Sequence, residues 1–348
     1  MGAATWHAHC LHSMTRVVAT CLLVLLPSLA AADDDHRGWR YLVDRLIADG
    51  VPRERVVAIF DDPRLEPFTG LEFGPISASR GYADARGEAA SLYRRFRRPS
   101  SIAAARRCRA ENAGALEEGE RIHGVPASLV AAILYVETGC GRNTGSSPVF
   151  YRLARLAMAN EPANVRANIA RLGRCSDEAL ELRARYLDDV FYPEVKAAFE
   201  AADRMGVNPL ALRGSASGAI GFPQFLPTSY LRYGTDGDGD GHVDLFDARD
   251  AAVSCAGYLT AHGWRTGLSL AAQRDVIWAY NHSRAYVDTV LFLTSAVARR
   301  VPTQQVDAPS GGQRVAAVAA PHRASGSART RACLGRPGPA RRHVTRRT

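Results

Sequence analysis

The sequence has almost no lysine, almost no strand pattern and no long apolar run beyond its N-terminal segment. Lys196 is the only lysine, and the other basic residues are arginines, which we attribute to codon usage in a GC-rich genome. Because hardly any segment alternates apolar and polar residues, the sequence predicts a mainly α fold. After residue 29 no apolar run is long enough to cross a bilayer, which argues against a membrane-spanning protein.

The N-terminal segment has the order of a secretory signal. The apolar run 17–29 follows a basic residue and precedes three alanines and Asp33. Residues 1–32 are therefore predicted to be cleaved, and Met14 is a more natural start than Met1. We expect the mature protein to be exported to the periplasm or cell envelope.

The positive charge is concentrated in the C-terminal tail. Residues 302–348 hold nine arginines and one acid, which gives +8. The whole chain carries +9 and the segment before Asp33 contributes +1, so 9 − 8 − 1 leaves residues 33–301 neutral. The composition of the tail predicts disorder. The tail either contacts polyanions such as teichoic-type polymers or lipid headgroups, or is a dispensable extension. No nucleic-acid partner is expected.

The body, residues 33–301, is predicted to be one catalytic domain with a helical N-terminal part at 33–100. Apolar periodicity predicts two short helices within 39–60, separated at 50–52. It also predicts one long helix over 102–123. Two further helices are expected, at 177–189 and 194–205.

The stretch 127–141, ASLVAAILYVETGCG, predicts a buried apolar helix with one carboxylate, Glu137, at its C-terminal end. Gly139 and Gly141 are expected to end this helix. An ionised carboxylate is costly to bury, so such a site favours the protonated acid. A glycosidase needs a carboxylic acid of this kind as its general acid. The alternative is a Glu that pairs with Arg142 or faces solvent.

Cysteine is scarce, and no CxxC or Cys/His spacing indicates zinc. Five cysteines follow the predicted signal, which allows two disulfides and one unpaired thiol in an oxidising compartment. Cys333 lies in the tail and is the natural unpaired one. The other four allow three pairings and are Cys108, Cys140, Cys175 and Cys255. We favour Cys140 with Cys175, because that bridge would pin the loop after Glu137.

Three further blocks carry candidate functional residues. In 213–230, RGSASGAIGFPQFLPTSY, small residues allow a backbone to approach a bulky ligand, and polar groups such as Gln224 can bind sugar hydroxyls. Tight helix packing is the alternative interpretation. The block 277–286, IWAYNHSRAY, offers aromatic faces and an amide. His282 lacks the context of a nucleophile and is expected to pack or hydrogen-bond.

The third block, 236–250, DGDGDGHVDLFDARD, has the spacing of an EF-hand-like calcium loop. Gly241 occupies the sharp turn, and residue 247 stands at the closing position with residue 250 as an alternative. An acidic turn without metal is the other possibility. The predicted Ca²⁺ ligands, with a structural role, are Asp236, Asp238, Asp240, the carbonyl of His242, Asp247 and Asp250.

Together these blocks resemble the B-type lytic murein transglycosylases, which have a lysozyme-like core. The matching segments are GVPASLVAAILYVETGCGRNTG, GSASGAIGFPQFLPTSY, DGDGDGHVDLFDARDAAVSCAGYLTAHGW and YNHSRAYVDTV, in the family's order over roughly 93–297. The resemblance implies a lysozyme-like fold, a calcium loop closed by Asp250, and peptidoglycan strands as the partner of a monomer. It implies a saccharide groove lined by Ser215, Gln224, Tyr258, Tyr280 and Asn281.

The resemblance also implies that Glu137 is the sole acid/base. It would protonate the oxygen between N-acetylmuramic acid and N-acetylglucosamine, then accept the proton of the C6 hydroxyl as that oxygen attacks C1. The product would be a 1,6-anhydromuramyl end. The blocks contain no second free acid, which suits this route better than two-carboxylate hydrolysis. A hydrolytic muramidase and a non-catalytic wall-binding protein are the alternatives.

The sequence departs from the family pattern near the catalytic block. Cys140 follows Gly139 where an arginine and an aromatic residue are more usual. A long insertion usually found after the HGW motif is missing after residues 262–264. These differences predict a shorter or more open groove and leave the preference for chain ends open.

Overall fold

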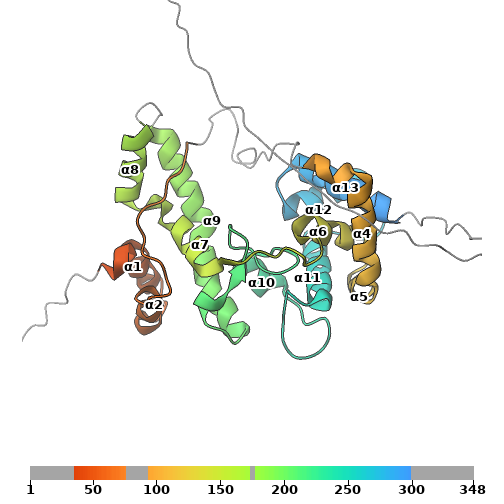
Figure 1. Cartoon of the computed structure of the whole chain (residues 1–348), viewed down its shortest axis with the longest axis horizontal. Coiled ribbons are helices and arrows are strands. Elements are labelled where there is room, and N and C mark those ends of the chain that lie inside the picture. The colour runs from red at the N-terminus through yellow and green to blue at the C-terminus, as the bar shows by residue number, and fades with distance from the viewer. Residues whose placement is uncertain (1–34, 76–92, 173–176, 299–348) are drawn as a thin grey trace, which may run out of the picture. The chain divides into compact units, whose positions relative to one another are not determined.

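The computed structural model describes residues 35–75, 93–172 and 177–298. The predicted signal at 1–32, the tail at 302–348, Cys175 and Cys333 lie outside these residues and stay predictions. In the described part the chain is mainly helical, as the sequence predicts (Figure 1). Among these residues, no helix combines the length and the apolar character that a bilayer crossing requires.

Longer connections precede η2, α10 and α11, and the one sheet of the described residues consists of two short strands. Strands β1 (Ser147–Pro148) and β2 (Arg213–Gly214) pair antiparallel. The α-helices are α1 (Arg40–Ala48), α2 (Arg53–Phe60), α4 (Pro99–Glu111), α5 (Ala113–His123), α6 (Ala127–Thr138), α7 (Val149–Ala157), α8 (Pro162–Leu172), α9 (Asp177–Arg204), α10 (Pro227–Tyr233), α11 (Ala248–Ala261), α12 (Leu270–Tyr280) and α13 (Arg284–Ala298). The 3₁₀ turns are η1 (His36–Gly38), η2 (Arg94–Arg97), η3 (Met158–Asn160) and η4 (Pro209–Ala211).

Two helix predictions are wrong in their continuity. The single helix expected over 102–123 is divided at Asn112, whose backbone leaves the helical region and whose side chain donates to the carbonyl of Cys108. The two helices expected at 177–189 and 194–205 are one helix, α9, that continues through Pro193. A proline removes one helical hydrogen bond, but α9 is packed on both sides of Pro193: Leu180 and Leu187 lie in a cluster with Ala159 of η3, and Val195 and Phe199 lie in the core with Phe150 of α7.

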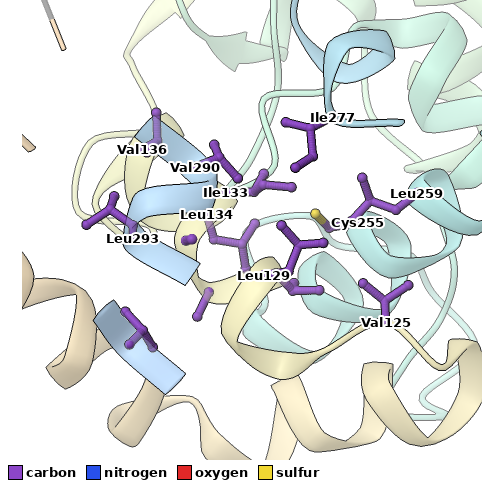
Figure 2. Close-up of a cluster of buried hydrophobic side chains, with 14 of the residues drawn as sticks. Val125, Leu129, Ile133, Leu134, Val136, Cys255, Leu259, Ile277, Val290 and Leu293 are labelled. Atoms are coloured by element: carbon purple, nitrogen blue, oxygen red, sulfur yellow. The ribbon is translucent and has the colours of Figure 1, made fainter. Parts of the chain in front are cut away.

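One core surrounds α6, which lies among α4, α5, α11 and α13 (Figure 1). Nearly every side chain of α6 is buried, because the helix is apolar all round. Figure 2 shows this cluster, in which Leu129, Ile133 and Leu134 meet Cys255 of α11 and Val290 of α13. Complete burial fixes the position of the helix end that carries Glu137.

A second core joins the N-terminal helices to α7 and α9. Trp39 and Phe60 pack with Phe150 and Phe199, and all four rings are buried. The break at 50–52 holds as expected, with α1 ending at Ala48 and α2 beginning at Arg53. The described N-terminal residues therefore share a core with helices from the middle of the chain.

Candidate active site

Glu137 is the penultimate residue of α6, and its position follows from how that helix ends. Gly139 ends the helix with a left-handed backbone, φ 61°, a conformation that glycine adopts readily. Thr138 secures the turn, because its hydroxyl donates to the carbonyl of Phe222 at 3.1 Å and accepts from the amide of Gly141 at 2.9 Å. The predicted helix end is confirmed, and Glu137 itself is half-buried.

Tyr286 of α13 holds the Glu137 carboxylate from the core side. Its hydroxyl donates to Oε1 at 2.7 Å. Tyr286 is buried, and burial together with the nearby Glu137 charge raises its pKa well above the usual range. The phenol therefore stays protonated and acts as a donor. Its ring lies parallel to that of Tyr280, with centroids 6.4 Å apart.

The glycine-rich block forms a loop between β2 and α10 that faces the same site. A backbone bridge between Ile220 and Phe225 closes a tight turn, in which Gly221 and Gln224 both have positive φ. The Cβ of any other residue at position 221 would collide with Leu245. Position 221 thus requires glycine, because its backbone lies against Leu245 with no room for a side chain.

Ser215 and Gln224 each keep a polar group available for a ligand. The hydroxyl oxygen of Ser215 accepts from the amide of Ala219 at 3.0 Å, and the hydroxyl hydrogen has no protein acceptor within the described chain. Gln224 donates through Nε2 to the carbonyl of Gly221 at 2.8 Å, while its Oε1 accepts no hydrogen bond from the described residues. Together they offer one donor and one acceptor.

The hydroxyls of Tyr258 and Tyr280 are already bonded to the backbone, and the Tyr258 ring stacks on His262 with centroids 4.0 Å apart. Tyr258 donates to the carbonyl of Ala279 at 2.8 Å, and Tyr280 donates to that of Pro223 at 2.6 Å. Burial raises the pKa of Tyr258 to about 12 and that of Tyr280 well above its usual range. Both hydroxyls therefore stay protonated, and stacking on a sugar ring is the contact left to them.

A groove of about 740 Å³ brings these residues together. Glu137, Ser215, Gln224, Tyr258, Tyr280 and Asn281 all line it. Glu137 is the only carboxylate among the described residues that line the groove. The geometry therefore matches the predicted set, while the role of each residue stays a prediction.

Sequence reasoning missed one side of the groove, which comes from α9. This side includes Arg183, Tyr186 and Phe191, and it brings a guanidinium and aromatic rings to the groove. The sequence indicated a helix here but gave no sign of which face meets the site. His282, expected to pack, also lines the groove, and its ring meets that of Trp278 edge-on at 5.5 Å.

The disulfide differs from the favoured pairing. Cys140 bonds to Cys108 of α4, with the two Cα atoms 6.0 Å apart, so the Cys140–Cys175 prediction is wrong. The reason is that α4 packs beside α6 and brings Cys108 to the turn after Glu137. Cys255 is a free thiol in the core, and burial raises its pKa to about 12, which leaves it unreactive.

The acidic loop lies between α10 and α11, in a helix–loop–helix order. Carboxylate oxygens of Asp236, Asp238 and Asp250 lie within 4.8 Å of one another. Asp247 lies outside this group because it caps α11, accepting from the amides of Arg249 and Asp250. Residue 250 is thus the closing acid of the cluster.

Backbone amides orient the acids of this loop. Asp236 accepts from the amides of Gly239 and Gly241 at 2.6 and 2.8 Å, and these hydrogen bonds lower its pKa. Asp250 accepts from the amides of Gly237 and Asp244, yet burial raises its pKa. The side chain of Asp240 accepts from the amide of His242 and is not part of the cluster.

This arrangement of helices is the fold of lytic transglycosylases. The structure of SLT35 from Escherichia coli in complex with calcium aligns with a TM-score of 0.55 at 24% identity, covering 77% of this chain and 94% of that one. The soluble lytic transglycosylase SltB1 of Pseudomonas aeruginosa aligns with a TM-score of 0.55 at 25% identity, covering 75% and 98%.

The sequence match agrees with the fold. The transglycosylase SLT domain profile matches residues 34–274. The chain therefore belongs to the transglycosylase SLT domain family, and the resemblance noted from its motifs is confirmed. It is also 34% identical over 161 residues to the membrane-bound lytic murein transglycosylase B of Escherichia coli K12. That match spans 46% of this chain and 38% of the relative.

Proposed function

We propose that this protein is a peptidoglycan lytic transglycosylase in which Glu137 acts first as acid and then as base. Protonated Glu137 gives its proton to the glycosidic oxygen as the C1–O bond to N-acetylglucosamine breaks. The resulting carboxylate takes the proton of the muramyl C6 hydroxyl while that oxygen bonds to C1. The ring closes as a 1,6-anhydro end, and no water is consumed.

The observation that carries this proposal is the single carboxylate of the groove. Hydrolytic glycosidases use two carboxyl groups, one on each side of the scissile bond. Among the described residues that line this groove, only Glu137 carries one. An attack by the substrate's own hydroxyl needs no second acid, so the groove suits transfer better than hydrolysis.

Tyr286 would keep the Glu137 carboxyl group oriented through both the acid step and the base step. A hydrogen bond from a phenol favours the charged carboxylate, and here it reaches Oε1 and not Oε2. The bond therefore fixes the orientation of the carboxylate through Oε1. Because the phenol is buried and neutral, it orients Glu137 without competing for its proton.

The other lining residues would bind the glycan strand. The Ser215 hydroxyl has a free hydrogen and Gln224 Oε1 a free acceptor site within the described chain, and these suit sugar hydroxyl and acetamido groups. Tyr258 and Tyr280 would stack on sugar rings, with the Asn281 amide beside them. A few polar groups beside aromatic rings are typical of sites that bind saccharides.

The direct test replaces the acid. Glu137→Gln is expected to lower turnover of purified sacculi by about 10²- to 10⁴-fold while binding of the glycan to the groove persists. Glu111→Gln is a matched control, because Glu111 is an exposed acid that pairs with Arg142 outside the groove. Unchanged turnover in Glu137→Gln would contradict the proposal, and loss in both variants would point to misfolding.

We further propose that the acidic loop binds a calcium ion with a structural role. Calcium prefers several oxygen ligands, and three carboxylates converge here, one of them buried. Asp236, Asp238 and Asp250 would hold the ion, with Asp240 and the His242 carbonyl as further candidates. A cation would offset the repulsion among the three acids and tie α10 to α11. The related SLT35 structure in complex with calcium is consistent with this role.

The proposed substrate places the protein in the cell envelope. Peptidoglycan lies outside the cytoplasmic membrane, and residues 1–32 have the order of an export signal. Fractionation of cells expressing the full chain tests this directly. Recovery of the protein in the cytoplasm, with the N-terminal segment intact, would contradict it.

A further inference from the structure

The neutral net charge of the body conceals a strongly basic surface. From Tyr93 to Ala110 the chain contains seven arginines and no acid. Six of them form what we call the arginine surface: Arg94, Arg95, Arg97, Arg98, Arg106 and Arg107. Five are exposed and Arg106 is half-exposed. None of the six forms an ion pair with another residue of the described chain, whereas Arg142 and Arg274 nearby are both paired.

Two contacts with α13 show that Arg97 and Arg106 meet the same helix. The Arg97 guanidinium of η2 lies over the Phe292 ring at 5.0 Å, and Arg106 Nε of α4 donates to the Ala296 carbonyl at 3.1 Å. Phe292 and Ala296 are four residues apart and therefore share one face of α13. Arg97 of η2 and Arg106 of α4 thus converge on the C-terminal half of that helix, and the other four arginines stand within three residues of them in the sequence.

The elements around this surface do not neutralise it. The second half of α13, from Thr289 to Ala298, carries no charged residue. The first turn of α4 has no acid either, and Arg98 stands at its N-cap, where a negative group is favoured. Positive charges at this helix end repel one another and the helix dipole. The positive charge of this surface is therefore not neutralised by the described residues around it, and the surface should attract an anion.

Half-exposed apolar side chains accompany the charge. Leu291 and Phe292 on α13 and Ile102 on α4 are each partly exposed. Arginine beside apolar and aromatic groups is the combination that binds at the interface of an anionic bilayer, where the guanidinium meets phosphate and the apolar group enters the headgroup region.

From this we infer that the arginine surface docks the folded body on a membrane surface rich in anionic phospholipid. Lipid headgroups and free phosphate would both be recognised through hydrogen bonds and ion pairs between phosphate oxygens and guanidinium groups. The arginines and the apolar side chains together favour a bilayer over a free anion, because a free phosphate would contact the arginines but not the apolar side chains.

The test is co-sedimentation of the full chain with vesicles of phosphatidylglycerol and phosphatidylethanolamine. The test variant Arg94→Gln/Arg95→Gln/Arg98→Gln removes three charges from the surface and keeps Arg97 on Phe292. The control Arg53→Gln/Arg166→Gln/Arg265→Gln removes three exposed arginines elsewhere, so both variants change the net charge equally. Each variant is shown to be folded if its melting temperature and its turnover of soluble glycan fragments equal those of the parent protein.

We expect the test variant to bind these vesicles more weakly by on the order of tenfold or more at low salt. The control should bind like the parent, neutral vesicles should not sediment either protein, and added salt should weaken binding. Equal losses in both variants would overturn the inference, because net charge or the tail would then explain binding. Full displacement by millimolar inorganic phosphate would overturn it in favour of a free-anion site. Loss of binding to an RNA oligonucleotide with vesicle binding intact would overturn it as well.

Discussion

The hydroxyl of Tyr286 donates to Oε1 of Glu137 at 2.7 Å, across the interface of two helices, although the two residues are 149 positions apart in sequence. This hydrogen bond links α13 to the end of α6 at the point where the groove meets the core. Removing the Tyr286 hydroxyl therefore changes the carboxylate's hydrogen bonding and leaves the ring beside Tyr280 in place.

Tyr286→Phe removes that bond and keeps the ring. A hydrogen bond to a charged group contributes about 1.5–3 kcal/mol, so turnover should fall by about tenfold or more. Because the donor favours the charged carboxylate, its loss should also move the pH–activity profile to higher pH. The measurement is kcat and KM over a pH series.

Tyr135→Phe provides the control for this variant, because Tyr135 lies on the same helix as Glu137 and its ring meets that of Phe96 edge-on at 5.8 Å. It should leave the pH profile in place. A Tyr286→Phe enzyme with lower activity and an unmoved profile would show a packing defect and would contradict the positioning role.

The disulfide should stabilise the turn after Glu137. Cys108→Ser/Cys140→Ser opens a loop that spans 32 residues, and the free energy of unfolding should fall by about 2–4 kcal/mol. Chemical denaturation measures this change. A reducing agent should lower the stability of the parent and leave the double variant unaffected. If the reducing agent destabilises both proteins equally, the bridge is not the cause.

In the acidic loop, a carboxylate of the cluster can be told apart from Asp247, which caps α11. Asp236→Asn should abolish the rise in melting temperature that calcium causes in the parent, since it removes a carboxylate from the cluster. Asp247→Asn should keep the rise, because asparagine also caps helices well and Asp247 lies outside the cluster. Melting curves with calcium and with excess chelator measure both. A response lost in Asp247→Asn but kept in Asp236→Asn would contradict this arrangement.

Gly221 should be sensitive to a single methyl group. Its φ is +69°, and an added Cβ would meet Leu245. Gly221→Ala should therefore lower the free energy of unfolding by about 1 kcal/mol for the unfavourable backbone conformation and by a further 1–3 kcal/mol for the clash. Gly267→Ala is the matched control, since its φ is +84° but nothing lies near the added Cβ. Equal losses of unfolding free energy in the two variants would show that the close approach to Leu245 is unimportant.

The sequence predicts those features of the site that local signals determine. Gly139 marks the end of α6, the break at 50–52 separates α1 from α2, and the acids of the loop have a recognisable spacing. Each depends on the backbone preference of one or two residues. Such preferences can be inferred without knowledge of the tertiary structure.

The features that the sequence did not predict depend on packing between distant segments. Cys108 reaches Cys140 because α4 lies beside α6, and no local pattern encodes that neighbour. Arg183 lines the groove because of the rotation of α9, and the same helix continues through Pro193 because both halves are packed. The arginine surface was hidden by a net charge of zero, which says nothing about where the charges lie.

The most direct test of the central claim is digestion of purified sacculi in ¹⁸O-labelled water, followed by mass spectrometry of the released muropeptides. Attack by the muramyl C6 hydroxyl predicts 1,6-anhydro ends, which are lighter than reducing ends by one water and carry no ¹⁸O. The Glu137→Gln protein should release almost none of them. Reducing muramyl ends that contain ¹⁸O would show that water is the nucleophile and would contradict the proposed mechanism.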